Sequence, residues 1–324
     1  MSHPSNTLSL VADIGGTNTR VALAEGRRVM PETIRRYHNA DYPGLESVLR
    51  AYVTAEDEVD VAAACVAVAG PVRDGRAAMT NLDWTIDGGT LTRATRAETV
   101  AILNDLQAQG HAIGHIDPAL VRGIVEGAAD PADDASKLVI GVGTGFNAAP
   151  VHDLAAGRFV AASESGHANL PIRSEDELRL MRYLSTAHGF ASVEDVLSGR
   201  GLEHLYAWLG IEADDPREAS AQAIMQGCAD ESDPRALEAA QIFARMLGTV
   251  AGNLALIHLP FGGVYLVGGV SRAFAPYLAR FGFAEAFRDK GRFAGFMGNF
   301  AVSVVEDDYA ALTGSAAYLA GLQG

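Results

Sequence analysis

Two segments of the chain share one pattern: an apolar run ends in a glycine-rich turn, and a second strand-like run follows at once. These segments are LVADIGGTNTR (10–20) and VIGVGTGF (139–146). Successive backbone N–H groups in such a turn can point the same way and bind anions, phosphates above all. An ordinary hairpin turn is the alternative, because Gly-Gly also joins antiparallel strands. Two such units predict two similar lobes that would place a nucleotide between them.

Strand-like and helical patterns alternate along the chain, which predicts an α/β fold. The length of 324 residues exceeds most single cores and suggests two domains. The polar segment 127–134 is expected to form a surface loop near a domain junction. Helices are expected at 43–52, from 106 onward and over most of 171–259, and strands at 7–14, 19–26, from the turn 25–28 to Tyr37, and at 59–72, 97–105, 136–146, 148–154, 158–165 and 262–270.

Composition and charge exclude several classes of protein. Hydrophobic residues make up 48% of the chain and charged residues 20%, which is typical of a globular protein. The formal net charge is −15 and only two lysines occur, so we expect neither a nucleic-acid partner nor an anionic membrane partner. Asp13 interrupts the first apolar run, and no signal peptide or membrane span is expected. The predicted location is cytoplasmic.

The metal-binding residue types are sparse and scattered. Cys65 lies in an apolar run and Cys228 in a polar stretch, so a structural disulfide is not expected and a cysteine-rich zinc site is excluded. His111 and His115 have the i, i+4 spacing of metal ligands, but no third ligand and no HExxH pattern accompany them. The sequence therefore predicts no zinc.

The second glycine turn has a rival interpretation as a dinucleotide fingerprint. Gly143-x-Gly145-x-x-Ala148 fits that loose pattern, and Glu164 follows at the distance expected for a ribose-binding acid. The fingerprint requires a helix directly after the turn, whereas Pro150 and the residues around it favour a hairpin, which argues against a dehydrogenase. A Walker A loop is excluded because neither lysine follows a glycine.

Asn104 and Asp105 end a very apolar strand, where α/β proteins commonly place their chemistry. Asp105 could accept a proton from a hydroxyl group as a general base, and Asn104 could bind the same substrate through its donor and its acceptor. The alternative is that one of them only caps the helix that follows. Both interpretations stay open from these residues alone.

Other polar side chains are suited to sugar hydroxyls, each of which donates and accepts a hydrogen bond. Glu164 and His167 lie in SESGHANLP, and Glu194 lies in SVEDVLSGRG. A solvated helix position for Glu194 and a structural role for His167 are the alternatives. A third turn, Gly268-Gly269, would let the flat face of a ligand approach the backbone, or would simply join a strand to a helix.

Taken together, these segments resemble the bacterial glucokinases of the actin/hexokinase/Hsp70 superfamily, nearly from end to end. Single blocks are weak signals, but all of them in this order are highly specific. The blocks are ADIGGTNTR, AVAGPV with MTNLDW, LNDL, GVGTGF, ESGH, VEDVLSGRGL, GGVYLVGGV, FRDKGRF and LTGSAAYL.

The resemblance implies a two-lobed actin-like (ribonuclease H-like) α/β fold with an interlobe cleft. It implies a small domain at 1–115 plus 308–324, a large domain at 116–307, and a homodimer. It also implies ATP-dependent phosphorylation of D-glucose at the 6-hydroxyl, with Mg²⁺ accompanying ATP.

The resemblance assigns roles residue by residue. Asp105 would be the general base, and Asp13 would lie near Mg²⁺. The implied glucose contacts are Asn104, Asp105, Glu164, His167 and Glu194, and the implied nucleotide contacts are Ala12, Asp13, Ile14, Gly15, Gly16, Thr17, Asn18, Gly143, Thr144, Gly145, Gly268 and Gly269.

Three residues depart from the pattern of the family. Val142 stands where proline is frequent, and Asn147 and Ser165 stand where glycine is usual. Ser165 could crowd the sugar or add a hydroxyl contact to it. The sugar is therefore left open between glucose, another hexose and an N-acetylhexosamine, and a non-catalytic sugar sensor remains an alternative.

Overall fold

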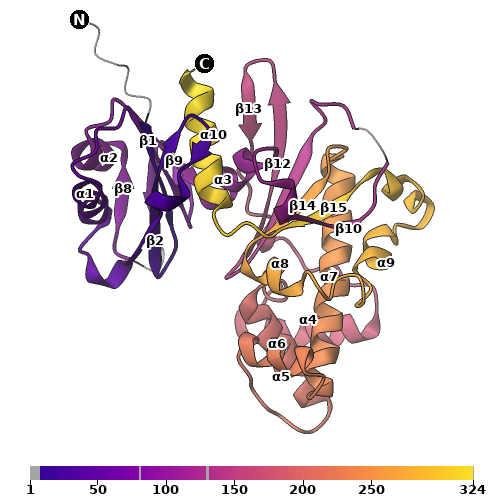
Figure 1. Ribbon diagram of the computed structural model, residues 1–324. Helices are drawn as coiled ribbons and strands as arrows, with labels where there is room; N and C mark the ends of the chain where they lie inside the picture. The colour runs from indigo at the N-terminus through magenta and orange to yellow at the C-terminus, as the bar shows by residue number, and fades with distance from the viewer. Residues whose placement is uncertain (1–7, 80–81, 129–130, 324) are drawn as a thin grey trace, which may run out of the picture. The chain divides into compact units, whose positions relative to one another are not determined.

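The computed structural model describes residues 8–79, 82–128 and 131–323. The chain divides into two compact units, each of which is described by itself (Figure 1). Unit 1 comprises Met1–Pro118, Ala155–Ala162 and Asp307–Gly324, and unit 2 comprises Ala119–Leu154 and Ser163–Glu306. These ranges follow contacts within the fold, so the predicted domain boundaries stay a prediction.

Unit 1 is built on a six-stranded sheet with the order β3-β2-β1-β5-β9, in which β4 also pairs with β2. β1 and β2 form an antiparallel hairpin, and β5 and β9 continue from β1 in parallel. A small second sheet, β6-β7-β8, lies in the same unit. The strands are β1 (Leu8–Ile14), β2 (Asn18–Glu25), β3 (Arg28–Val29), β4 (Arg35–His38), β5 (Ala63–Val68), β6 (Val72–Arg73), β7 (Arg76–Ala78), β8 (Thr85–Asp87) and β9 (Thr99–Asn104).

Helices cover both faces of the unit 1 sheet, as Figure 1 shows. Leu10, Ala12 and Ile14 face α1 and α2, while Val11 faces α3 and α10. This alternation follows from the two-residue period of a strand. The helices are α1 (Leu45–Ala55), α2 (Gly88–Thr95), α3 (Asp105–Ala112) and α10 (Ala310–Gln323). Burial on both faces explains why β1 and β5 are so apolar.

Unit 2 repeats the same arrangement of central strands. β11 and β12 form an antiparallel hairpin, and β14 and β15 continue from β11 in parallel. The sheet order is β10-β15-β14-β11-β12-β13. The strands are β10 (Val121–Val125), β11 (Lys137–Val142), β12 (Phe146–Leu154), β14 (Val264–Val267) and β15 (Val302–Val305), together with β13 (Gly157–Val160), whose residues are counted in unit 1. Both glycine turns therefore join antiparallel strands, as the hairpin alternative expects, and the predicted pair of similar strand–turn–strand units is observed.

Most helices of unit 2 follow one another between β13 and β14. They are α4 (Glu175–His188), α5 (Gly199–Glu212), α6 (Ala221–Ala229) and α7 (Pro234–His258), and two short helices, α8 (Gly269–Phe274) and α9 (Phe283–Arg288), come after β14. Among the described residues α7 alone is long and apolar enough to cross a membrane, yet 61% of its most apolar window is buried inside the protein. It supplies Phe243, Leu247 and Ala251 to the core, as expected of a core helix.

The predicted elements are largely observed, with two corrections. The third strand expected up to Tyr37 is two short strands, β3 and β4, because a 3₁₀ turn at Pro31–Thr33 separates them. A proline pre-set for the start of a helical turn explains the break. The expected helical stretch 171–259 is interrupted by a non-helical segment before α5 that carries Glu194. Part of the predicted loop 127–134 lies outside the described residues.

Candidate functional site

The first glycine turn joins β1 to β2 at residues 15–17 in unit 1. Gly15 N–H donates to the carbonyl of Asn18 (3.0 Å), and the buried Asn39 braces the turn from the other side. Asn39 donates from Nδ2 to the Gly15 carbonyl (2.8 Å) and from its backbone N–H to the Thr17 carbonyl (2.9 Å). These bonds occupy backbone carbonyls, while Gly16 and Thr17 are exposed. The turn therefore has the form expected of an anion-binding loop.

Asp13 lies on β1 directly opposite Arg20 on β2. The Arg20 guanidinium is 3.3 Å from Asp13 Oδ2. Burial raises the pKa of Asp13, and the charge and hydrogen bond of Arg20 oppose that rise. Keeping the Asp13 carboxylate beside the turn therefore costs desolvation free energy. A cation bound next to it would offset that cost.

Asn104 and Asp105 begin α3, and Asn104 does cap it. Leu106 N–H donates to Asn104 Oδ1 (3.0 Å), and the Gln107 side chain accepts from Asn104 N–H (3.2 Å), which completes a capping box. Asn104 Nδ2 donates to the Gly70 carbonyl (3.0 Å). The amide keeps one N–H and one lone pair for a ligand. Capping and ligand binding are thus compatible at this residue.

Asp105 accepts a hydrogen bond from Leu106 N–H (2.9 Å) through Oδ1. Burial and, next, the negative charge of Asp13 raise the pKa of Asp105 to about 6, although hydrogen bonds from Leu106 and Asn104 oppose the rise. A carboxyl group with such a pKa is mostly ionised at neutral pH and more basic than an exposed one. It meets the requirement for a general base.

The mutual repulsion of Asp13 and Asp105 also bears on Mg²⁺. Two carboxylates close enough to raise a pKa electrostatically are relieved when a divalent cation binds beside them. Mg²⁺ is usually held in proteins by one or two carboxylates together with substrate phosphates. The chemistry of these two carboxylates therefore fits the predicted ion.

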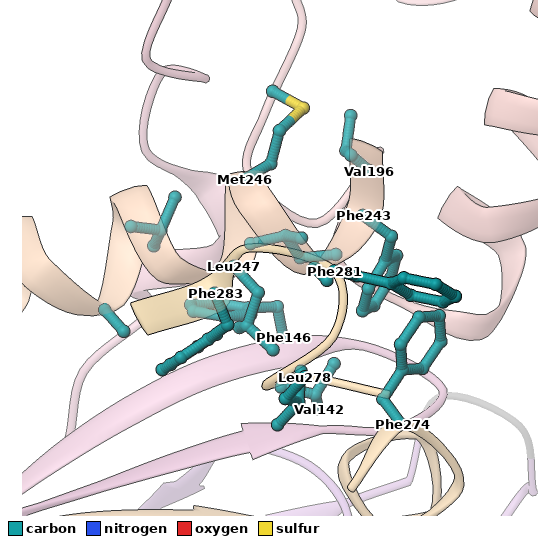
Figure 2. Close-up of a cluster of buried hydrophobic side chains, with 14 of the residues drawn as sticks. Val142, Phe146, Val196, Phe243, Met246, Leu247, Phe274, Leu278, Phe281 and Phe283 are labelled. Carbon is teal, nitrogen blue, oxygen red and sulfur yellow. The ribbon is translucent and has the colours of Figure 1, made fainter. Parts of the chain in front are cut away.

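The second glycine turn joins β11 to β12 at residues 143–145 in unit 2. Gly143 N–H donates to the Gly145 carbonyl (2.9 Å), and Gly199 N–H, at the start of α5, donates to the Gly143 carbonyl (2.9 Å). Thr144 is exposed at the tip. Figure 2 shows Val142 and Phe146, which flank the turn, within the hydrophobic cluster around Phe243. A packed core therefore holds both ends of this turn.

Glu194 fixes the same turn from the segment before α5. Its Oε2 accepts a hydrogen bond from Phe146 N–H (2.9 Å), and its own N–H donates to the Gly166 carbonyl (2.9 Å). Its Oε1 lies 3.6 Å from the Arg200 guanidinium, which is 62% exposed. The alternative of a solvated helix position is wrong, because Glu194 lies in a turn and holds backbone groups together.

Glu164 and His167 bracket a short 3₁₀ turn, Ser165–His167, and both are exposed. His167 N–H donates to the Glu164 carbonyl (3.2 Å). Gly166, between them, passes so close to β12 that a Cβ there would lie 2.0 Å from the Phe146 carbonyl oxygen. The structure thus brings Glu164, His167 and Glu194 to one region of unit 2, next to the second turn.

The third glycine turn joins β14 to α8. Gly268 has φ +97°, and a Cβ there would lie 2.5 Å from the Val142 carbonyl oxygen, so only glycine fits without strain. Gly269 and Val270 line a cavity of about 370 Å³ with residues of α5 and α6. Its walls are mainly apolar, and Gln222 and Gln226 add amide groups. A flat heterocycle with polar edges suits such a cavity.

Several residues of the site escaped the sequence-based prediction. Asn39 and Arg200 reach their turns from other elements, and nothing local in the sequence marks them. Arg20 could have been found, because a hairpin centred on the first turn places it opposite Asp13. Gln222 and Gln226 read as ordinary surface positions of α6.

The described residues contain no group of three His, Cys, Asp or Glu side chains arranged to hold a metal ion. His111 is buried with its ring 4.9 Å from that of Tyr318. Cys65 and Cys228 are buried free thiols. A cavity of about 780 Å³ among α4, α5, α7 and α9 holds none of the predicted site residues. Charged side chains on its rim pair with one another, as Arg173 does with Asp289 (2.6 Å).

Comparison with known proteins bears on the whole chain. Residues 10–322 match the model of the glucokinase family. A glucokinase of Erwinia tasmaniensis is 33% identical over 318 residues, which covers 96% of each chain.

Solved structures of glucokinases have the same fold as this chain. The crystal structure of a glucokinase from an Antarctic psychrotroph superimposes with a TM-score of 0.86 at 30% identity, covering 97% of this chain and 98% of that one. A ROK family glucokinase from Streptomyces griseus, solved with glucose and AMPPNP, superimposes with a TM-score of 0.61 at 23% identity, covering 98% of this chain and 100% of that one. The predicted actin-like α/β fold is confirmed, and the match across nearly all of its length shows that this chain belongs to the glucokinase family.

Proposed function

We propose that the protein transfers the γ-phosphoryl group of ATP to the 6-hydroxyl of D-glucose and releases ADP. Family membership supports the reaction, and the related Streptomyces griseus protein was solved with glucose and a non-hydrolysable ATP analogue. One observation carries the proposal for this chain. Asp105, at the end of β9, has a pKa raised to about 6 beside the first glycine turn and Asp13.

Asp105 acts as the general base in this proposal. The 6-hydroxyl oxygen attacks the γ-phosphorus, the bond to the bridging oxygen of ADP breaks, and the hydroxyl proton passes to the Asp105 carboxylate. A pKa of about 6 leaves the carboxylate ionised at neutral pH, so it is ready to accept that proton. Phosphoryl transfer otherwise depends mainly on alignment and charge neutralisation.

The nucleotide is held by backbone groups rather than by a lysine. Residues 12–18 of the first turn and 143–145 of the second bind phosphate oxygens, and the cavity beside Gly268 and Gly269 takes the adenine. Asp13 holds Mg²⁺, which when bound neutralises charge on the phosphates. The net charge of −15 is no obstacle, because N–H dipoles and the ion act locally.

The sugar is bound by side chains that both donate and accept hydrogen bonds. Glu164 and His167 are exposed, and Asn104 keeps one donor and one acceptor. Glu194 has Oε1 available beside its long contact to Arg200. A homodimer, a cytoplasmic location and domains at 1–115 plus 308–324 and 116–307 remain part of the proposal.

ADP release from ATP and Mg²⁺ tests the function, measured with glucose, mannose, fructose, N-acetylglucosamine and no sugar. We expect turnover with glucose well above the rate without sugar. Turnover with another sugar alone would keep the mechanism and contradict the proposed substrate. Nucleotide binding without turnover on any of these sugars would contradict the enzyme and favour a sugar sensor.

A further inference from the structure

Asn147, the second residue of β12, is the centre of a dense hydrogen-bond network in unit 2. Its Oδ1 accepts from Ala148 N–H (2.8 Å) and from Ser165 N–H (3.0 Å). The Ser165 hydroxyl donates to the same oxygen (3.2 Å), and the Ser163 hydroxyl oxygen lies 3.0 Å from it. Its Nδ2 donates to the Ser163 carbonyl. The two backbone N–H donors determine which end of the amide is the oxygen.

This network binds both neighbours of Glu164. Ser163 is fixed through its carbonyl and hydroxyl, and Ser165 through its N–H and hydroxyl. Ser163 also donates to the Ala148 carbonyl (2.5 Å), so the segment is tied to β12 twice. Glu164 itself makes no side-chain capping bond to the turn that follows it. The position of the Glu164 backbone, from which its exposed side chain extends, is therefore set by the residues on either side.

The backbone after Glu164 is held equally closely. Gly166 packs against the Phe146 carbonyl, and its own carbonyl accepts the Glu194 N–H (2.9 Å). A shift of the 163–165 segment would therefore change the positions of Glu164 and His167 together. The anchor that sets this segment along β12 is the Asn147 side chain.

The network also shows what the Ser165 hydroxyl contacts, which the sequence left open. Its hydroxyl donates to Asn147 Oδ1, so it supports the loop. The two departures from the usual family glycines, at 147 and 165, are bonded to each other. An isolated serine beside a sugar site would present an unsatisfied hydroxyl, whereas here Asn147 supplies its acceptor.

We propose that Asn147 is a positioning residue that, with Ser165, aligns Glu164 and His167 for the sugar and so sets sugar affinity. The proposal rests on the proposed function, because it assumes that these two side chains contact the sugar. Asn147 touches neither substrate in this account and acts only through the segment it holds.

Steady-state kinetics of Asn147→Ala test the proposal, with glucose and ATP varied separately and glucose affinity measured by calorimetry. Loss of several bonds to one loop predicts a rise in KM and Kd for glucose of about tenfold or more, with KM for ATP changed by less than about twofold. Asn147→Asp keeps the shape and the acceptor but loses the donor to Ser163. It should lie between the wild type and Asn147→Ala.

A cycle of Asn147→Gly, Ser165→Gly and the double variant measures the coupling of the two residues. We expect the double variant to raise KM for glucose by less than the product of the single effects, because each change removes the partner of the other. Ser174→Ala is the matched control. It removes the cap of α4 in the same unit (Glu177 N–H to Ser174 Oγ, 3.2 Å) and should leave KM for glucose unchanged.

Equal effects on glucose and ATP in Asn147→Ala would overturn the proposal, as would an equal rise in Ser174→Ala. Should Asn147→Ala fail to fold, Ser165→Ala decides, since it removes one hydroxyl and keeps the backbone bond; an unchanged glucose Kd would then contradict the proposal. A wild type that binds no sugar of the panel would defeat the proposed function itself, and this inference with it.

Discussion

The two glycine turns occupy equivalent places in two sheets of the same topology, yet their surroundings differ. The first turn, between β1 and β2, has an acidic setting, with Asp13 on its own strand and Asp105 near enough to be affected by its charge. The second, between β11 and β12, is braced by Glu194 and lies next to the segment that carries Glu164. The scaffold supplies two similar glycine turns, and the residues around each turn give it a different environment.

The strand that pairs in parallel with the first strand of each hairpin, β5 in one sheet and β14 in the other, is also followed by glycine. After β5 comes Gly70, whose carbonyl accepts the Asn104 amide, while β14 is followed by Gly268 and by Gly269, which lines a cavity. One strand end thus supports a polar side chain, and the other leaves space for a ligand. We infer that proton transfer belongs to unit 1 and recognition of the sugar and base mainly to unit 2.

Of the substitutions that test this division, Asp105→Ala should have the largest effect, which is a loss of kcat. Loss of a general base typically lowers kcat by about 10²–10⁴-fold, and glucose binding should persist because Glu164, His167 and Glu194 remain. Steady-state kinetics with calorimetry for glucose would measure both. Near-normal kcat would remove Asp105 from the role of base.

Glu164→Gln should affect sugar recognition, which we assign mainly to unit 2. Replacing a charged hydrogen-bond acceptor by a neutral one should raise KM for glucose by about 10–100-fold and leave KM for ATP nearly unchanged. Titrating one substrate at saturation of the other separates the two. An equal rise for both substrates would argue against a sugar contact.

Alanine at Gly268 and at Gly143 should separate a glycine required by the fold from one that faces a ligand. Gly268→Ala meets the Val142 carbonyl at φ +97° and should lower the free energy of unfolding by about 1–3 kcal/mol. A Cβ at Gly143 meets no protein atom within 4 Å. Gly143→Ala should therefore keep its stability while KM for ATP rises, and denaturant unfolding with ATP kinetics checks both.

The acidic setting of the first turn should also be visible in stability. Because burial raises the folded-state pKa of Asp105 from 3.8 to about 6, its ionised form destabilises the fold above pH 6, and this penalty fades as the pH falls toward 4. Asp105→Asn should then be more stable than the wild type by about 2–3 kcal/mol at pH 7.5 and about equal at pH 4.

Asp87→Asn is the control for that measurement, because the effect of Asp87 on the free energy of unfolding should have the opposite dependence on pH. Hydrogen bonds from Thr90 lower the pKa of Asp87, so its stabilising effect is present at neutral pH and lost in acid. Chemical denaturation at several pH values measures both variants. A wild type more stable than Asp105→Asn at pH 7.5 would contradict the assigned pKa.

Much of the fold followed from local patterns. β1 and β5 were predictable because strands covered on both faces are almost wholly apolar, and the hairpin after the second turn because Pro150 does not suit a helix interior. The break between β3 and β4 was missed although Pro31 marks it, since proline is disfavoured inside a strand.

Some residues of the candidate site could likewise be predicted from local patterns, and others could not. Asp13, Asp105 and the glycines stand at strand ends, where a local pattern marks them. Asn39, Arg200 and the bond between Asn147 and Ser165 depend on which segments fold together, and no spacing in the sequence encodes that. The capping role of Asn104 was foreseen as an alternative to ligand binding, whereas its amide can serve both.

The pH dependence of kcat/KM for glucose tests the central claim most directly, because it reports the essential base in the enzyme form that binds glucose. With ATP and Mg²⁺ saturating, the account predicts a single acid limb with an apparent pKa of about 6, below which kcat/KM falls about tenfold per pH unit. Circular dichroism at each pH should show that the protein stays folded. A kcat/KM that is constant from pH 7.5 down to pH 5 would contradict Asp105 as the base.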